Sequence, residues 1–84
     1  MTKNRNLKKK IIFRSKHRGT KEMDFLLGKF VKENIDSFTT SELNNLEDLI
    51  DLDDEILQKW YFNNIHKNLI PINRVTNMLK KYKV

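Results

Sequence analysis

The chain has 84 residues, a net charge of +6 and no cysteine, so it can form one small domain but no disulfide or thiolate–metal site. No apolar run approaches the ~20 residues of a membrane span. The basic first residues are not followed by the apolar segment of a secretory signal. We therefore expect no membrane insertion and a reducing compartment.

The charges are segregated along the chain. The first 21 residues carry nine Lys or Arg and no acid, residues 22–58 carry all eleven acids, and residues 59–84 carry six Lys or Arg and no acid. Two explanations stay open. Basic terminal helices could complement an acidic middle inside one bundle, or faces of opposite sign could guide docking onto a partner and fix its orientation.

The first two predicted helices span residues 6–17 and 20–34. In the first, Leu7 and Ile11 lie one turn apart on a small apolar face. The second has apolar residues spaced i, i+3, i+4, i+7 and i+8, which is typical of a helix packed by one face. This apolar stripe consists of Met23, Leu26, Leu27, Phe30 and Val31. Gly28 in the same helix costs about 1 kcal/mol relative to alanine, so we expect a close contact with another helix there.

Three further helices are predicted in the rest of the chain. Thr39 and Glu42 have the spacing of a capping box, which predicts a third helix from Thr39. Asp53 can cap a fourth helix, and Pro71 suits the first turn of a fifth. The apolar residues expected to be buried by the third and fourth helices are Leu43, Leu46, Leu49, Ile50, Ile56, Leu57 and Trp60. The fifth helix would run from Pro71 through Ile72, Val75, Leu79 and Tyr82.

These elements define the predicted fold class. No segment alternates like a strand over a useful length, and the connections are short enough for neighbouring helices. The fold is therefore predicted to be all-α, a small five-helix bundle forming a single domain over residues 1–84. Residues 1–5 and 83–84 are expected to fray.

The joint between the first two helices is the best candidate for a working surface. Gly19 follows the first helix and suits the left-handed residue that often ends a helix. Thr20 can cap the second helix, and Glu22 and Asp24 then lie near the positive end of its dipole. The joint places an Arg18 that we expect to be exposed, a glycine and two carboxylates within seven positions, and no core requires that set.

The side chains after the joint should point away from the core. At about 100° per residue, Glu22 and Asp24 lie on either flank of the apolar stripe and Phe25 lies nearly opposite it. Phe25 therefore either faces solvent or packs against a second layer. A purely structural joint, with a glycine stop and a capped acidic helix, would have most of these features too.

Catalysis and metal binding are not expected. His17 and His66 are far apart in sequence, and neither has a second metal ligand at helical spacing. Glu22 and Asp24 diverge by about 200° on a helix, which argues against a shared acid–base pair. With two glycines, the chain has no glycine-rich phosphate loop.

Nucleic-acid binding is the alternative function that the basic composition suggests. The residues that could follow a phosphate backbone are Lys8, Lys9, Lys10, Arg14 and Arg18. The acids on the middle helices of the same small domain argue against this function. No helix-turn-helix or aromatic RNA-binding motif is recognisable either.

The pattern R-G-x-x-E-x-D at residues 18–24, followed by F-L-L-G-K-F, resembles the succinate dehydrogenase assembly factor family, the flavinylation factors called SdhE in bacteria. Residues 46–50 and 53–60 resemble the leucine-rich, acidic and tryptophan segment of that family. The resemblance runs from about residue 11 to residue 78. One departure is His17, where the family usually has Arg or Lys. Another is the tail, where Pro71 opens the last helix and acidic residues are absent.

The resemblance implies what the chain does and what it binds. It implies an assembly factor, not itself an enzyme, that binds the flavoprotein subunit of succinate dehydrogenase, and by extension of related fumarate reductases. It would promote covalent attachment of FAD to a histidine of that subunit. FAD would belong to the partner, so the chain would need no cofactor and no metal of its own. We expect a monomer in the cytoplasm of a bacterium.

The resemblance also implies a partner-binding surface. Arg18 would contact a partner carboxylate or carbonyl, Gly19 would permit close backbone approach, and Glu22 would pair with a partner cation or orient Arg18. Asp24 would stiffen the helix start or form the rim, and Arg14 would extend the same face. The complete predicted set is Arg14, His17, Arg18, Gly19, Glu22, Asp24 and Phe25.

Overall fold

The computed structural model describes residues 2–16 and 18–82, with only the backbone of residues 2–4. Its helices are α1 (Thr2–Lys16), α2 (Lys21–Asn34), α3 (Thr40–Ile50), α4 (Asp54–Asn63) and α5 (Arg74–Lys81). Two short 3-10 helices, η1 (Ile35–Ser37) and η2 (Lys67–Leu69), lie in the connections. The described part of the chain contains no strand, and the prediction of an all-α, five-helix bundle is confirmed.

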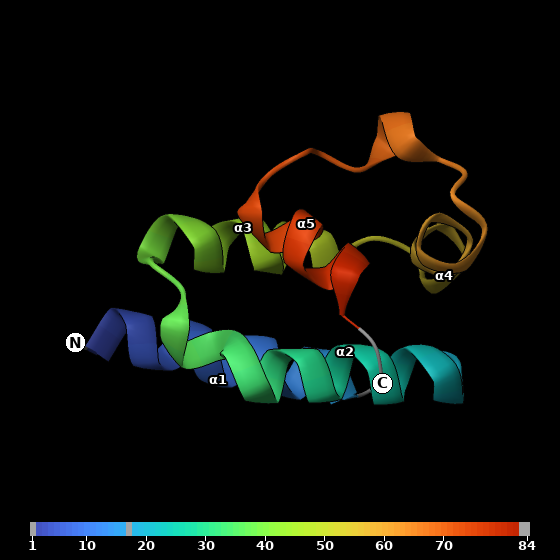
Figure 1. Cartoon of the computed structure of the whole chain (residues 1–84). Helices are drawn as coiled ribbons and strands as arrows, with labels where there is room; N and C mark the ends of the chain where they lie inside the picture. Colours follow the sequence, from blue (N-terminus) through green and yellow to red (C-terminus); the bar gives the residue numbers. More distant parts are fainter. Residues whose placement is uncertain (1, 17, 83–84) are drawn as a thin grey trace.

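The helices are arranged in two layers. Figure 1 shows α1 and α2 side by side, with α3 and α5 packed over them and α4 at one end of the bundle. The joint between α1 and α2 lies at the same end as α4. This arrangement brings residues around position 18 next to the connection between α3 and α4, which follows more than thirty residues later in the sequence.

The apolar faces of all five helices meet between these layers. The whole predicted stripe of α2 is buried, and Ile11 of α1 packs against it. The other buried apolar residues of the core are Ile35, Phe38, Leu43, Leu46, Leu49, Ile50, Leu57, Trp60, Ile70, Val75 and Leu79. No helix in the described residues is long and apolar enough to cross a membrane.

Two of the three side chains predicted to cap α2, α3 and α4 form the expected capping hydrogen bonds. Thr20 accepts a hydrogen bond from the backbone N of Met23 at 3.2 Å and so caps α2. Thr39 and Glu42 form the predicted capping box, with N–O distances of 3.2 Å and 2.9 Å. Asp53 occupies the N-cap position of α4 without a side-chain capping bond.

The predicted helix contact at Gly28 is also confirmed. A Cβ added to this residue would lie 3.7 Å from Cγ of Lys16 and 3.8 Å from the backbone oxygen of Ser15. Both atoms belong to α1, so Gly28 faces the neighbouring helix of the lower layer, and an added Cβ would make ordinary van der Waals contact there.

Two predicted boundaries are wrong. Helix α1 begins at Thr2 and not near residue 6. Helix α5 begins at Arg74, because Asn73 and Thr76 form a reciprocal capping box that fixes the helix start three residues after Pro71. Ile72, which we expected in this helix, consequently lies outside it and is 89% exposed.

Interhelix ion pairs account for much of the charge segregation. Cations of α1 pair with carboxylates of the acidic middle segment, and Arg74 of α5 pairs with Glu42 of α3 at 2.9 Å. The pairs made by α1 are Lys8–Asp36 at 3.2 Å, Lys10–Glu47 at 2.8 Å, and Arg14–Asp51. The first explanation, charge complementarity inside the bundle, therefore holds for these residues. Four of the five cations proposed to follow nucleic-acid phosphates are paired with carboxylates within the protein, namely Lys8, Lys10, Arg14 and Arg18.

Candidate partner-binding site

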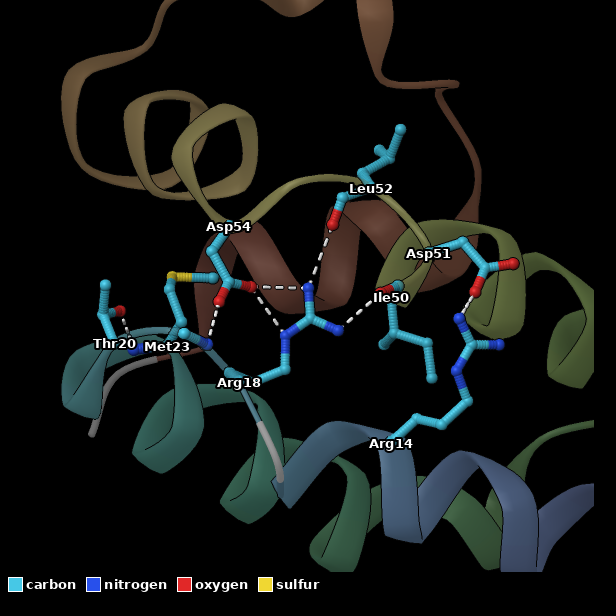
Figure 2. A network of polar contacts seen from close by, with 9 residues as sticks. Arg14, Arg18, Thr20, Met23, Ile50, Asp51, Leu52 and Asp54 are labelled. Atoms are coloured by element: carbon cyan, nitrogen blue, oxygen red, sulfur yellow. Dashed lines mark hydrogen bonds and ion pairs between the residues drawn. The ribbon is translucent and has the colours of Figure 1, made fainter.

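Arg18 leaves the α1–α2 joint and inserts its guanidinium between the end of α3 and the start of α4 (Figure 2). Its Nε donates to Oδ1 of Asp54 at 2.7 Å, and its Nη2 lies 2.6 Å from the same oxygen. Nη1 donates to the backbone oxygen of Ile50, and Nη2 donates to that of Leu52 at 3.0 Å. The side chain is only 9% exposed, so the prediction of an exposed Arg18 is wrong.

Arg18 is buried because the end of α3 needs hydrogen-bond donors. The last carbonyls of a helix have no partner within it and carry the negative end of its dipole. A guanidinium has several donors in a fixed fork and can satisfy carbonyls and a carboxylate together. Arg18 thus ties the carbonyl of Ile50, the last residue of α3, and that of Leu52 in the following connection to Asp54 in the first turn of α4.

Gly19 completes this contact from the backbone. Its N–H donates to Oδ2 of Asp54, the other oxygen of the carboxylate that binds Arg18. An added Cβ would lie 3.0 Å from that oxygen, which is tighter than ordinary packing. Gly19 is not in the left-handed region, which among the described residues is occupied by Asn64 and His66. The predicted left-handed glycine is therefore wrong, and the close approach that Gly19 permits here is to its own chain.

Arg14 forms the outer part of the same region. Its guanidinium pairs with Asp51, and both side chains are partly exposed, at 36% and 45%. An open cleft of about 390 Å³ lies beside the contacts of Arg14 and Arg18, and we call it the clasp cleft. Its lining residues are Phe13, Arg14, Arg18, Gly19, Ile50, Asp51, Leu52, Asp53 and Asp54.

The other predicted residues lie elsewhere. Asp24 and Phe25 line a second groove of about 670 Å³, which we call the lysine groove. Its remaining lining residues are Lys16, Lys21, Gly28, Lys29 and Lys32. Phe25 faces solvent with 59% of its surface exposed, and Nζ of Lys29 lies 5.6 Å from the centre of its ring. Glu22 is exposed and lines neither hollow. His17 lies outside the described residues.

The predicted set is therefore divided between two surfaces. Sequence reasoning missed Asp54, which binds both Arg18 and Gly19, and it missed the lysines around Phe25. The spacing of Arg14 and Arg18 roughly matches that of Asp51 and Asp54, but this becomes a signal only when α1 and α3 are known to be neighbours. No cluster of three or more His, Cys, Asp or Glu side chains that could hold a metal occurs within the described ranges.

The fold and these two surfaces define a small all-α protein in which an Arg-Gly-x-x-Glu joint is fastened to the connection between two later helices. A family model described as flavinator of succinate dehydrogenase matches residues 9–83, and the chain belongs to this family. The prediction from the Arg-Gly-x-x-Glu-x-Asp pattern is thereby confirmed at the level of the family.

Several curated proteins are similar to the chain. The FAD assembly factor SdhE of Acetobacter pasteurianus is 35% identical over 88% of this chain and 65% of its own length. A mitochondrial succinate dehydrogenase assembly factor 2 of Dictyostelium discoideum is 35% identical over 88% of the chain and 50% of its own length. The protein of that name in Meyerozyma guilliermondii is 31% identical over 76% of the chain and 47% of its own length.

The chain thus spans less than two thirds of the length of these relatives. No solved structure matches it significantly. The relatives are named as assembly factors and not as enzymes, in agreement with the prediction that the chain is not an enzyme.

Proposed function

We propose that the chain binds the flavoprotein subunit of succinate dehydrogenase and promotes covalent attachment of FAD to it. The observation that carries this proposal is the family match over residues 9–83, which includes the whole Arg-Gly-x-x-Glu joint. The names of the relatives, FAD assembly factor and succinate dehydrogenase assembly factor, support it. We further propose that the chain works as a monomer in the cytoplasm of a bacterium.

The chain would act by positioning. The partner supplies both the flavin and the histidine that becomes bonded to it, and the bound chain holds the conformation in which the two meet. FAD stays with the partner, and the chain contributes no catalytic group. Such a role needs a rigid surface of defined shape, because a misplaced reacting atom loses most of the benefit of proximity.

The hydrogen bonds that Arg18 and Gly19 make with Asp54, Ile50 and Leu52, which we call the clasp, give the joint that rigidity. Arg18 and Gly19 direct their donors at Asp54 and at the end of α3, so their part in docking is to fix the path of the backbone at the joint. Glu22 lies in the first turn of α2 and is exposed, and no ion pair joins it to another described residue. We assign Glu22 to a charge-assisted contact with a cation of the partner.

The test is coexpression of the flavoprotein subunit with this chain, followed by in-gel fluorescence of covalent flavin after denaturation. Wild type should raise covalent flavin several-fold above the subunit expressed alone. Glu22→Lys should remove most of that gain. Asp48→Lys is the matched control, because Asp48 is also an exposed helical acid and lines neither hollow.

The two variants separate a specific contact from an effect of net charge. Both change the net charge by the same amount, and both sites are solvent-exposed, so both proteins should fold. If wild type adds no covalent flavin, the proposed function is wrong. If the two variants lose equal amounts of activity, the role assigned to Glu22 is wrong.

A further inference from the structure

The lysine groove lies on the side of α2 that the core does not use. Lys21, Phe25, Gly28 and Lys32 follow one another at helical spacing along one face of α2. Lys16, at the end of α1, closes the groove from the neighbouring helix. Because Gly28 has no side chain, the middle of this face stays hollow.

The charges of this groove are uncompensated. Four lysines line it against one carboxylate, that of Asp24. Within the described ranges, no ion pair joins Lys16, Lys21 or Lys32 to a carboxylate, and Lys29 lies over the ring of Phe25. A concave surface of one sign attracts a partner of the opposite sign and concentrates it there.

The centre of the groove is apolar. Phe25 is 59% exposed at a position where the fold does not need an aromatic residue, because the core uses the opposite face of α2. An aromatic side chain with a charged surround is the usual composition of an interface anchor and its rim. The groove therefore offers a partner one apolar contact surrounded by cations.

We propose that the lysine groove binds an acidic segment of the flavoprotein partner, with Asp or Glu side chains paired to the lysines and one apolar side chain packed on Phe25. This inference rests on the proposed function. A peptide segment matches all the features of the groove, because Asp24 can accept a hydrogen bond from a backbone N–H. The backbone of a phosphate polymer offers Asp24 no N–H donor, and its bases would find one ring where several stacking platforms are needed. A flat lipid surface would not fill a hollow of about 670 Å³.

Zero-length carbodiimide crosslinking tests the contact directly, because this reagent joins a lysine amine only to a carboxylate that touches it. The chain and the flavoprotein subunit are mixed, crosslinked and analysed by mass spectrometry. Crosslinks from Lys21, Lys29 or Lys32 to Asp or Glu of the flavoprotein are expected. Crosslinks that involve only lysines outside the groove would overturn the proposal.

Charge reversal measures the strength of the contact. The double variant Lys21→Glu/Lys32→Glu should bind the flavoprotein about tenfold more weakly than wild type at about 0.1 M salt. At about 1 M salt, where screening acts within about 3 Å, the difference should nearly vanish. The control Lys9→Glu/Lys81→Glu makes the same change of net charge at exposed helical lysines outside the groove and should bind like wild type.

The outcomes separate this inference from the proposed function. If wild type binds the flavoprotein and raises covalent flavin but both double variants behave alike, the groove proposal is wrong and the proposed function stands. If wild type neither binds nor raises covalent flavin, both are wrong. Binding of wild type to a 20-base-pair DNA duplex or to anionic phospholipid vesicles at physiological salt, lost in Lys21→Glu/Lys32→Glu, would also overturn the proposal.

Discussion

The clasp cleft and the lysine groove are both formed around the joint between α1 and α2, yet they use cations in opposite ways. In the clasp cleft, Arg14 and Arg18 are paired with carboxylates of the acidic middle segment. In the lysine groove, Lys21 and Lys32 have no such pair among the described residues. A basic residue that the motif specifies can therefore serve the fold, whereas Lys21 and Lys32, which the motif does not specify, form no ion pair with a carboxylate of the described residues.

The largest expected effect comes from breaking the clasp. Arg18→Ala removes one member of a nearly buried ion pair, since the side chains of Arg18 and Asp54 are 9% and 17% exposed. It leaves Asp54 and two backbone carbonyls without their donor, and such a loss costs about 3 kcal/mol. Urea denaturation monitored by circular dichroism measures the change in the free energy of unfolding.

Arg14→Ala is the matched control for this prediction. Its ion pair with Asp51 borders the same cleft but is 36% and 45% exposed, so its loss should cost less than about 1 kcal/mol. Equal losses in the two variants would contradict the distinction between a buried clasp and an exposed rim. They would also contradict the view that the main role of Arg18 is to stabilise the fold.

The two glycines give the second comparison. A Cβ at Gly19 would lie 3.0 Å from Oδ2 of Asp54, and Arg18 holds that carboxylate in place, so Gly19→Ala should destabilise the fold by about 1 kcal/mol. At Gly28 the nearest atoms are 3.7 Å and 3.8 Å away, so Gly28→Ala should stabilise the fold by about 0.5 to 1 kcal/mol through helix propensity. Thermal melts of the two variants should shift in opposite directions, and shifts of the same sign would refute this assignment.

The parts of the fold that sequence predicted correctly depend on neighbours within one or two helical turns. The buried stripe of α2 and the caps at Thr20 and Thr39 all follow from spacing along the chain. Pro71 failed as a helix start because Asn73 and Thr76 cap each other and so fix the helix start at Arg74. Two competing local signals cannot be ranked by pattern alone, since the winner depends on geometry that the fold supplies.

The candidate site shows where local reasoning ends. The Arg-Gly pair was found by its pattern. The exposure of Arg18 was predicted wrongly, because its partner Asp54 lies 36 residues away in the sequence. Gly19 was found for the wrong reason, since it permits an approach to Asp54 and not a left-handed turn. Interactions at that separation require the helix packing of Figure 1 before they can be recognised.

A smaller effect is expected from the ion pair that joins α3 to α5. The backbone N–H of Thr39 and the guanidinium of Arg74 hold the pKa of Glu42 below its ordinary value of 4.5. A depressed carboxylate pKa stabilises the folded state above the unfolded pKa, and this contribution is lost as the pH falls through the folded pKa. Wild type should be more stable than Glu42→Gln near neutral pH, and the difference should shrink as the pH falls below 4.5 and disappear below the folded-state pKa of Glu42. Unfolding curves recorded across this range check the prediction, and a difference that does not change with pH would contradict it.

The smallest expected effect on stability, and the sharpest contrast with the clasp, belongs to Phe25. Phe25→Ser should change the free energy of unfolding by less than about 0.5 kcal/mol, because the ring is 59% exposed and lies on the face of α2 that the core does not use. The same substitution should weaken binding to the flavoprotein subunit severalfold, since it removes the apolar centre of the lysine groove. Phe62→Ser is the control, because Phe62 is also exposed, at 53%, but lies against Tyr61 in the last turn of α4 and does not line the lysine groove. If Phe25→Ser destabilised the fold as much as Arg18→Ala, Phe25 would be part of the fold, and the contrast between the two surfaces would not hold.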